Sequence, residues 1–181
     1  ATDFGDVRIP RRFGSGASST TRGIMTNGHG GSPADYQSMT EYITIASLGN
    51  AIDFGDSTDS RNAPAGGNNN WRAVSAGGVD GGGPKDVIDY VTIASMGDFT
   101  DFGNLSSGRY YFAGNINSKV RCVFGGGDHP DAKRNIIDYI TTVSTGNATD
   151  FGDIGANKAS PFGCSSDIRG LIAGGNTPSL Q

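Results

Sequence analysis

A four-residue motif recurs at nearly constant spacing, and this repetition limits the possible folds more than any other feature of the chain. The tetrad Asp-Phe-Gly-Asp/Asn begins at Asp3, Asp53, Asp101 and Asp150, about 49 residues apart. A period of roughly 20–50 residues is the signature of supersecondary units that stack on one another. The sequence therefore predicts a single repeat domain, residues 1–181, with units at about 1–50, 51–98, 99–147 and a partial unit at 148–181.

Other positions keep the same phase as the tetrad. A basic residue follows each tetrad: Arg11, Arg61, Arg109 and Lys158. A glycine comes next: Gly16, Gly66, Gly114 and Gly163. An arginine follows in every unit: Arg22, Arg72, Arg121 and Arg169. After a small pair that includes glycine, the first three units add a tyrosine before the next tetrad: Tyr42, Tyr90 and Tyr139. So many matched positions indicate that each unit has the same local structure.

The segments between tetrads read as strands. EYITIAS (41–47) and DYVTIAS (89–95) alternate and are rich in β-branched and aromatic residues, which favours strands. Shorter apolar runs such as RCVFGGG (121–127) end in glycine pairs, which indicates a buried strand and a turn. The chain has 30 glycines and a single glutamate, Glu41, so a mainly helical protein is excluded.

Three or four antiparallel strands per unit are what β-propeller blades use. We therefore expect an all-β, β-propeller-like fold of about four units. A trimeric or stacked β-fibre built from the same units is the alternative architecture, because the partial fourth unit contains no tyrosine strand. For the same reason we expect the protein to be a homo-oligomer or part of a longer chain, since an unpaired sheet edge is a template for pairing.

Structural roles can be assigned to the repeated side chains. The tetrad phenylalanines, Phe4, Phe54, Phe102 and Phe151, are expected to fill the space between sheets. We expect Arg22, Arg72, Arg121 and Arg169 to hydrogen-bond carbonyls or tetrad aspartates of a neighbouring blade. The glycine pairs are expected where the backbone is too crowded for a side chain.

The repeat resembles one found in tail-fibre-like and other virion structural proteins of marine bacteriophages, especially those that infect cyanobacteria. The resemblance rests on IDYITTVSTGNATDFGD (137–153) and GCSSDIRGLIAGG (163–175) and covers nearly the whole chain. Such repeats are kelch-like, with a glycine pair followed by a spaced tyrosine. The kelch tryptophan has no counterpart, because the single tryptophan, Trp71, precedes its glycine pair. The resemblance implies a structural or receptor-facing part of a phage particle, located on the virion outside the cell, without catalytic residues.

Charge and composition exclude several partner classes. The formal net charge is −4, which argues against nucleic acid or an anionic membrane surface as the main partner. No apolar run approaches the roughly 18 residues needed to span a bilayer, so membrane insertion is not expected.

The histidines, tetrad aspartates and cysteines are candidates for metal binding or catalysis, and each has a structural explanation. His29 and His129 lie in similar loops, but no metal-ligand spacing accompanies them, so we expect surface residues and no metal site. The tetrad carboxylates could bind calcium, and no other cofactor is expected; aspartates that bond their own turns explain the same pattern. A pair of carboxylates acting as a glycosidase should break the repeat, and each repeated aspartate keeps its context. The two cysteines, Cys122 and Cys164, are not repeat-equivalent and are expected to be small buried thiols.

Aromatic residues outside the repeat are the candidate binding residues. Trp71 follows three asparagines, while Tyr110 and Tyr111 follow Arg109. Aromatic rings beside polar side chains can hold a glycan or receptor by stacking and hydrogen bonding.

We therefore expect a non-enzymatic phage virion protein, a tail-fibre or particle-decorating component. It would act by assembly with itself or other virion proteins and by recognition of a host surface glycan. A carbohydrate-binding propeller, a kelch-type enzyme and a self-assembling repeat filament are the alternatives.

Overall fold

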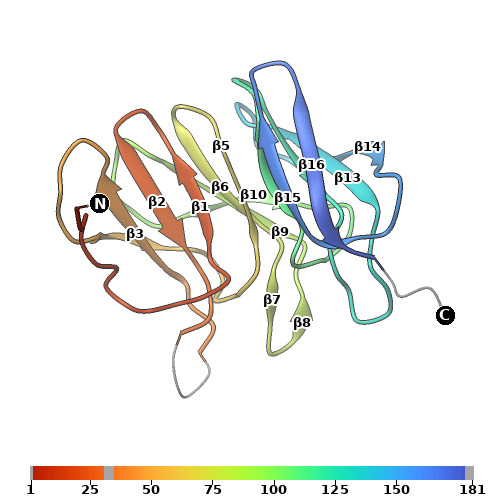
Figure 1. Cartoon of the computed structure of the whole chain (residues 1–181), viewed down its shortest axis with the longest axis horizontal. Helices are drawn as coiled ribbons and strands as arrows, with labels where there is room; N and C mark the ends of the chain where they lie inside the picture. The colour runs from red at the N-terminus through yellow and green to blue at the C-terminus, as the bar shows by residue number, and fades with distance from the viewer. Residues whose placement is uncertain (1, 31–34, 178–181) are drawn as a thin grey trace.

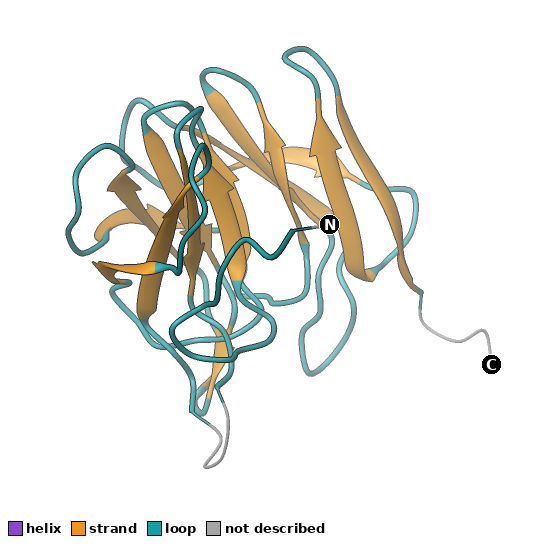
Figure 2. Ribbon diagram, turned by 60° about the vertical axis from the view of Figure 1, so that its left-hand side comes forward, coloured by secondary structure: helices purple, strands orange, loops and turns teal. Residues whose placement is uncertain are grey.

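The computed structural model describes residues 2–30 and 35–177, and the regular structure within these ranges is entirely β (Figures 1 and 2). The prediction of an all-β protein is therefore confirmed. These ranges also contain no helix long and apolar enough to cross a lipid bilayer.

Three sheets have four antiparallel strands each, and in every sheet the strands neighbour one another in chain order. The first sheet contains β1 (Ser15–Ser18), β2 (Arg22–Thr26), β3 (Met39–Thr44) and β4 (Ile52–Asp56). The second contains β5 (Ala65–Asn68), β6 (Arg72–Ala76), β9 (Val87–Thr92) and β10 (Thr100–Asn104). The third contains β11 (Ala113–Asn117), β12 (Arg121–Gly125), β13 (Ile136–Thr141) and β14 (Thr149–Asp153).

Two smaller sheets complete the described chain. A fourth sheet has only β15 (Ala159–Ser165) and β16 (Gly170–Asn176), and a short hairpin of β7 (Val79–Asp80) and β8 (Gly83–Pro84) projects from the second sheet (Figure 1). Three of the four tetrads form β4, β10 and β14, and each of these closes the sheet before it, while the tetrad at Asp3 lies in an irregular segment. The sheets are thus offset by one strand from the sequence units.

The strand register is the same in the three larger sheets. The arginine that begins each second strand lies opposite a threonine of the third strand, in the pairs Arg22–Thr44, Arg72–Thr92 and Arg121–Thr141. The third and fourth strands pair with a register shift beside the tetrad. Such bulges bend and twist a strand, and here they occur at equivalent places.

The first strands of successive sheets lie side by side, so close that a side chain is excluded. A Cβ on Gly66 would lie 2.2 Å from the Gly16 carbonyl oxygen, and a Cβ on Gly114 would lie 2.3 Å from that of Gly66. A Cβ on Gly163 would in turn meet the Gly114 oxygen at 2.2 Å. Only glycine permits this approach, which explains the glycine at Gly66, Gly114 and Gly163; a Cβ on Gly16, in the first unit, would lie 3.6 Å from the Ile24 oxygen, an ordinary contact.

The glycine pairs are also crowded, as expected. A Cβ on Gly77 would lie 2.6 Å from the carbonyl oxygen of Arg109, and Gly77 has a φ of 58°. The following residue, Gly78, donates its N–H to the same Arg109 oxygen at 2.9 Å. The pair therefore combines a left-handed turn with a hydrogen bond to the next sheet, both of which favour glycine.

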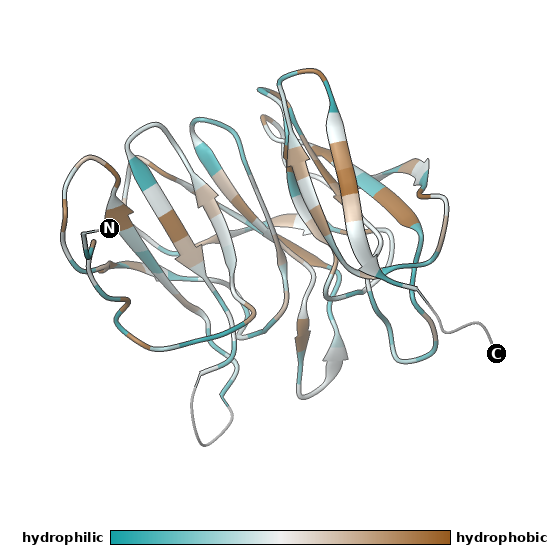
Figure 3. Ribbon diagram, in the orientation of Figure 1, coloured by the Kyte–Doolittle hydropathy of each residue, from teal (hydrophilic) through white to brown (hydrophobic). Residues whose placement is uncertain are grey.

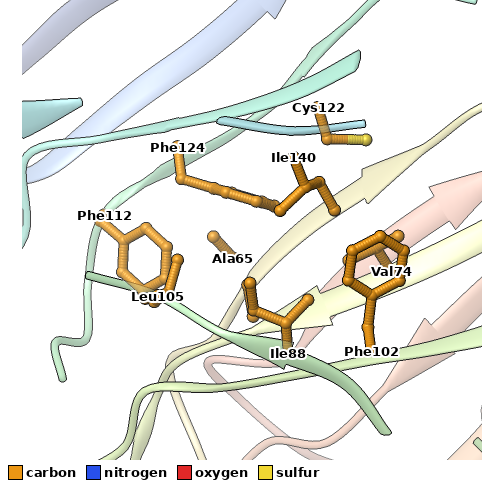
Figure 4. Packing of buried hydrophobic residues seen from close by; sticks show 10 residues of the cluster. Ala65, Val74, Ile88, Phe102, Leu105, Phe112, Cys122, Phe124 and Ile140 are labelled. Atoms are coloured by element: carbon orange, nitrogen blue, oxygen red, sulfur yellow. The ribbon is translucent and has the colours of Figure 1, made fainter. Parts of the chain in front are cut away.

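Hydrophobic residues recur along the strands, while many loop residues are hydrophilic (Figure 3). The buried apolar side chains form two clusters between adjacent sheets. One core cluster joins Val74, Ile88 and Phe102 of the second sheet to Phe124 and Ile140 of the third (Figure 4). A second cluster joins the first sheet to the second; its buried members are Ile24, Phe54, Ala73, Val91, Ile93 and Phe99. Burying each large side chain stabilises the fold by about 1.5–3 kcal/mol.

The tetrad phenylalanines follow this pattern only where a complete sheet comes next. Phe54 and Phe102 are each 3% exposed between sheets, which confirms their predicted role. Phe151 is 58% exposed, so the prediction is wrong there. Within the described residues the neighbouring fourth sheet has only two strands, and no third strand covers Phe151 there. Phe4 is half-buried in an irregular segment, and its carbonyl accepts the Gly49 N–H at 2.8 Å.

Candidate functional site

An arginine, a tyrosine and a phenylalanine form the same stack in each of the three larger sheets. The guanidinium carbons of Arg22, Arg72 and Arg121 lie 4.7, 4.4 and 4.5 Å from the ring centres of Tyr42, Tyr90 and Tyr139. Each tyrosine meets a tetrad phenylalanine edge to face, with ring centres 5.9, 5.7 and 6.0 Å apart. Cation–π and edge-to-face contacts of this kind hold the second, third and fourth strands together.

Two of these arginines also connect adjacent sheets, as predicted. Arg22 donates to the carbonyl oxygen of Ile93 and Arg72 donates to that of Thr142, both at 2.8 Å. Arg121 stacks on Tyr139 but has no such side-chain bond within residues 2–30 and 35–177, and the exposed Arg169 has none there either. The prediction is therefore wrong for these two arginines within the described residues. The acceptors of Arg22 and Arg72 directly follow the third strand of the next sheet, and the described residues of the fourth sheet include only two strands.

Three ion pairs are buried at equivalent positions, and the sequence analysis missed their acidic members. Arg11 pairs with Glu41 at 2.7 Å, Arg61 with Asp89 at 2.8 Å, and Arg109 with Asp138 at 2.8 Å. Both side chains are fully buried in the last two pairs. Burial lowers the pKa of Arg109, and Asp138 opposes this shift. The acid always precedes the repeated tyrosine, a signal that could have revealed the pairing.

The tetrad aspartates mainly build turns. Asp3, Asp101 and Asp150 each accept the N–H of the glycine two residues later, at 3.1, 3.1 and 2.8 Å. This is the turn-building role weighed against calcium binding. Within the described ranges, no group of three or more His, Cys, Asp or Glu side chains could hold a metal ion. His29 stacks edge to face on Tyr36, and His129 contacts Asp131.

The predicted binding aromatics lie at opposite ends of the first strands. Tyr111 precedes β11 and lines an open groove of about 470 Å³ together with Phe13 and Phe162. The rings of Tyr111 and Phe13 meet edge to face at 5.3 Å, although they come from the third and first sheets. Tyr110 pairs with Asp128 in a β-bridge, and burial raises the pKa of its phenol. Trp71 is not part of this groove.

An unusual backbone positions the residues of this groove. Phe13, Ala63, Tyr111 and Ser160 all have φ between 51° and 57°. The N–H of each of the last three donates to the carbonyl of the preceding member, at 2.7, 3.1 and 2.7 Å. Left-handed conformations cost energy in residues other than glycine and persist where the surrounding structure holds them. Here a row of hydrogen bonds across four sheets does so.

Trp71 lies in a different cavity, at the tips of the hairpins that join the first and second strands. This tip pocket measures about 380 Å³ and is formed by three successive sheets. Its lining residues are Asn68, Asn69, Asn70, Trp71, Asn117, Ser118, Lys119 and Asp167.

The backbone around Trp71 is fixed while its ring is free. The Trp71 N–H donates to Asn69 Oδ1 at 2.9 Å, and its carbonyl accepts the Ile93 N–H at 2.8 Å. The residue as a whole is nevertheless 66% exposed. The ordered backbone thus presents a solvent-facing ring on which a ligand can stack.

The polar floor of the tip pocket is also ordered. Asn68 and Asn117 exchange hydrogen bonds between the second and third sheets, each at 3.2 Å. Asn70, Lys119 and Asp167 are exposed, and their side chains make no hydrogen bond within the described part of the chain. Fixed amides and free polar groups thus surround one exposed aromatic ring.

The cysteines differ from each other. Cys122 is buried, as predicted, and burial raises the pKa of its thiol to about 12. Cys164 is exposed, so the prediction of two buried thiols is wrong for it. Its strand, β15, belongs to the incomplete fourth sheet.

Comparison with family models and with curated proteins gives no match for this chain.

Proposed function

We propose that this chain is a non-enzymatic structural and recognition module of a phage particle, a tail-fibre or particle-decorating component that binds a host-surface glycan. In this proposal the sheets form a β-propeller-like arc, and the tip pocket around Trp71 is the binding site. The observation that carries the proposal is the single exposed indole ring, fixed by its backbone and surrounded by polar side chains from three sheets.

The buried ion pairs support the structural, non-enzymatic part of the proposal. Arg61, Asp89, Arg109 and Asp138 are fully buried and neutralise one another within the sheets. Titratable groups in such pairs hold strands together and have no access to a substrate. The repeat resemblance described above supports the assignment to a virion.

The recognition part is supported by the chemistry of the tip pocket. Sugars present apolar ring faces that stack on indole and hydroxyl groups that bond to amides and charged side chains. Trp71 supplies the ring, while Asn70, Lys119 and Asp167 supply free donors and acceptors. Hairpin tips can vary in sequence without disturbing the strands behind them, which suits a surface that must match a changing host.

A glycan microarray that includes bacterial surface polysaccharides tests the proposal. Wild-type protein should bind a subset of glycans, and Trp71→Ala should weaken that binding at least tenfold, because stacking on the indole is lost. The control is Phe162→Ala, which removes an aromatic ring that is 79% exposed but lies in the groove at the other end of the first strands. Absence of glycan binding, or binding that survives Trp71→Ala, would contradict recognition at this pocket.

The carbohydrate-binding propeller that is not part of a virion remains the second candidate, because the same pocket would serve it. Immunodetection of the protein in purified phage particles separates the two: a virion component is present at fixed copy number, and a free lectin is absent.

A further inference from the structure

A buried polar network closes the junction between the first and second sheets. Asn27, directly after β2, is fully buried, and its Oδ1 accepts the hydroxyl of Ser75 in β6 at 2.9 Å. Its Nδ2 donates to the hydroxyl of Ser57, directly after β4, at 2.6 Å. Both serines are buried as well. One amide side chain of the first sheet thus connects two hydroxyl groups across the junction.

The backbone around Asn27 completes this network. Its Nδ2 also lies 3.2 Å from the carbonyl oxygens of Gln37 and Asp59. Its φ of 59° is left-handed, a conformation that asparagine tolerates better than most residues. Both polar atoms of the side chain therefore have partners, as a buried amide requires. The other units have glycine at this position: Gly77, Gly126 and Gly174.

The junction between the second and third sheets has apolar groups at the same repeat positions. The counterparts of Asn27, Ser57 and Ser75 are Gly77, Leu105 and Phe124. Leu105 and Phe124 lie in the core cluster together with Phe112 (Figure 4). The Phe112 ring occupies the space beside Gly77, where a Cβ would lie 2.8 Å from it. The counterpart of Phe112 in the first junction is the smaller Pro64.

The two kinds of junction cannot exchange single faces. If Asn27 faced Phe124, its amide would be buried without a partner, which is costly. If Gly77 faced small hydroxyl side chains, a cavity would remain, and the hydroxyls would lose the amide that they bond. Each face therefore fits only one kind of neighbour.

We propose that this polar network determines which repeat units pack against one another. The first sheet accepts a unit with two small hydroxyl residues at the facing positions, and the second unit has them. It excludes apolar units, whether from this chain or from another copy: the third unit has Leu105 and Phe124, and the fourth has Ile154 and Ile172. Single buried polar residues set register and partner choice in coiled coils in the same way. The inference concerns assembly of the units and is independent of glycan recognition.

Thermal unfolding of the whole chain, followed by circular dichroism, tests whether the two kinds of face are incompatible. In Ser75→Phe an apolar ring faces Asn27, and we expect the melting temperature to fall by about 10 °C or more. A four-residue variant gives the first junction the residues of the second: Asn27→Gly, Ser57→Leu, Pro64→Phe and Ser75→Phe. It should recover most of that loss. An unchanged melting temperature in Ser75→Phe, or no recovery in the four-residue variant, would overturn the proposal.

Refolding from urea at high protein concentration tests the choice of partner. Wild type should return to its native size, as measured by size-exclusion chromatography with light scattering. The four-residue variant should give several-fold more of larger, domain-swapped species, because its first junction now accepts the apolar faces of other copies. The control Thr40→Val removes a buried hydroxyl that contacts Thr26 within the first sheet, and it should refold as wild type does. Equal shares of larger species in wild type and the four-residue variant would overturn the proposal.

Discussion

The guanidinium of Arg61 donates to the Asp89 carboxylate at 2.8 Å, and neither side chain is exposed to solvent. The Asp89 carboxylate also accepts the Thr58 hydroxyl at 2.6 Å. Removing one member leaves the other charge buried without a partner, which typically costs about 3–5 kcal/mol. We expect Asp89→Ala to lower the free energy of unfolding by about that amount in urea denaturation. A loss below about 1 kcal/mol would contradict a structural role for the pair.

Replacing both members should be less harmful than replacing one. In the double variant Arg61→Met/Asp89→Leu, apolar side chains occupy the space of the ion pair, and no buried charge is left without a partner. The double variant should therefore recover most of the stability lost in Asp89→Ala. If the double variant is less stable than the single one, the pair contributes more through its geometry than through charge neutralisation.

The close approach of the first strands predicts a large effect from one methyl group. In Gly114→Ala the new Cβ would lie 2.3 Å from the Gly66 carbonyl oxygen, so the two strands must separate. We expect a loss of about 2–3 kcal/mol or more, measured by urea denaturation. Gly155→Ala is the matched control, because a Cβ at Gly155 meets nothing within 4 Å. Equal stabilities of the two variants would rule out the tight glycine contact.

The two thiols should differ sharply in reactivity. The thiolate is the reacting species, and the pKa of Cys122 is raised to about 12 by burial. At pH 8 the Cys122 thiol is therefore protonated and shielded from reagents, whereas Cys164 is exposed. A disulfide-exchange reagent should therefore label one thiol in the native protein and two in urea. Rapid labelling of Cys122 in native wild type, identified by mass spectrometry, would contradict its burial.

The hairpin of β7 and β8 contains a pair that responds to pH. The Lys85 ammonium lies 2.7 Å from Asp80 and lowers the pKa of that carboxyl below its ordinary value of 3.8. A lowered carboxyl pKa stabilises the fold above the unfolded-state pKa, and the contribution is lost as pH falls through the folded-state pKa. NMR titration should find the Asp80 midpoint below 3.8, and Lys85→Met should raise it. An unchanged midpoint in Lys85→Met would show that the ion pair is not formed.

Contacts between repeated positions could be predicted from the sequence, because the constant spacing places the same residue types side by side within each sheet and between adjacent sheets. Strand positions follow from alternation and glycine pairs. The bonds from Arg22 and Arg72 to the next sheet follow from the phase of the repeat. The acids Glu41, Asp89 and Asp138 keep the same phase and were within reach of the same reasoning.

Two features could not be predicted in the same way: the solvent exposure of Phe151, and the position of Trp71 and Tyr111 in two separate cavities. Phe151 is preceded by Thr-Asp and followed by Gly, as Phe102 is, and its exposure differs because the sheet beside it has two strands among the described residues. Trp71 and Tyr111 occupy different phases of the repeat, one at a hairpin tip and one before a first strand. The two residues lie at opposite ends of the first strands. Repeat spacing does not show which end of a strand a residue occupies in space.

The most direct test of glycan recognition uses a natural feature of the chain, since Trp71 is its single tryptophan. Tryptophan fluorescence should be recorded while the strongest glycan from the microarray is titrated into the whole protein. We predict a saturable shift to shorter wavelength, because a sugar stacked on the 66% exposed indole removes it from water. A glycan that binds without changing this emission would place recognition elsewhere and contradict the assignment of the tip pocket.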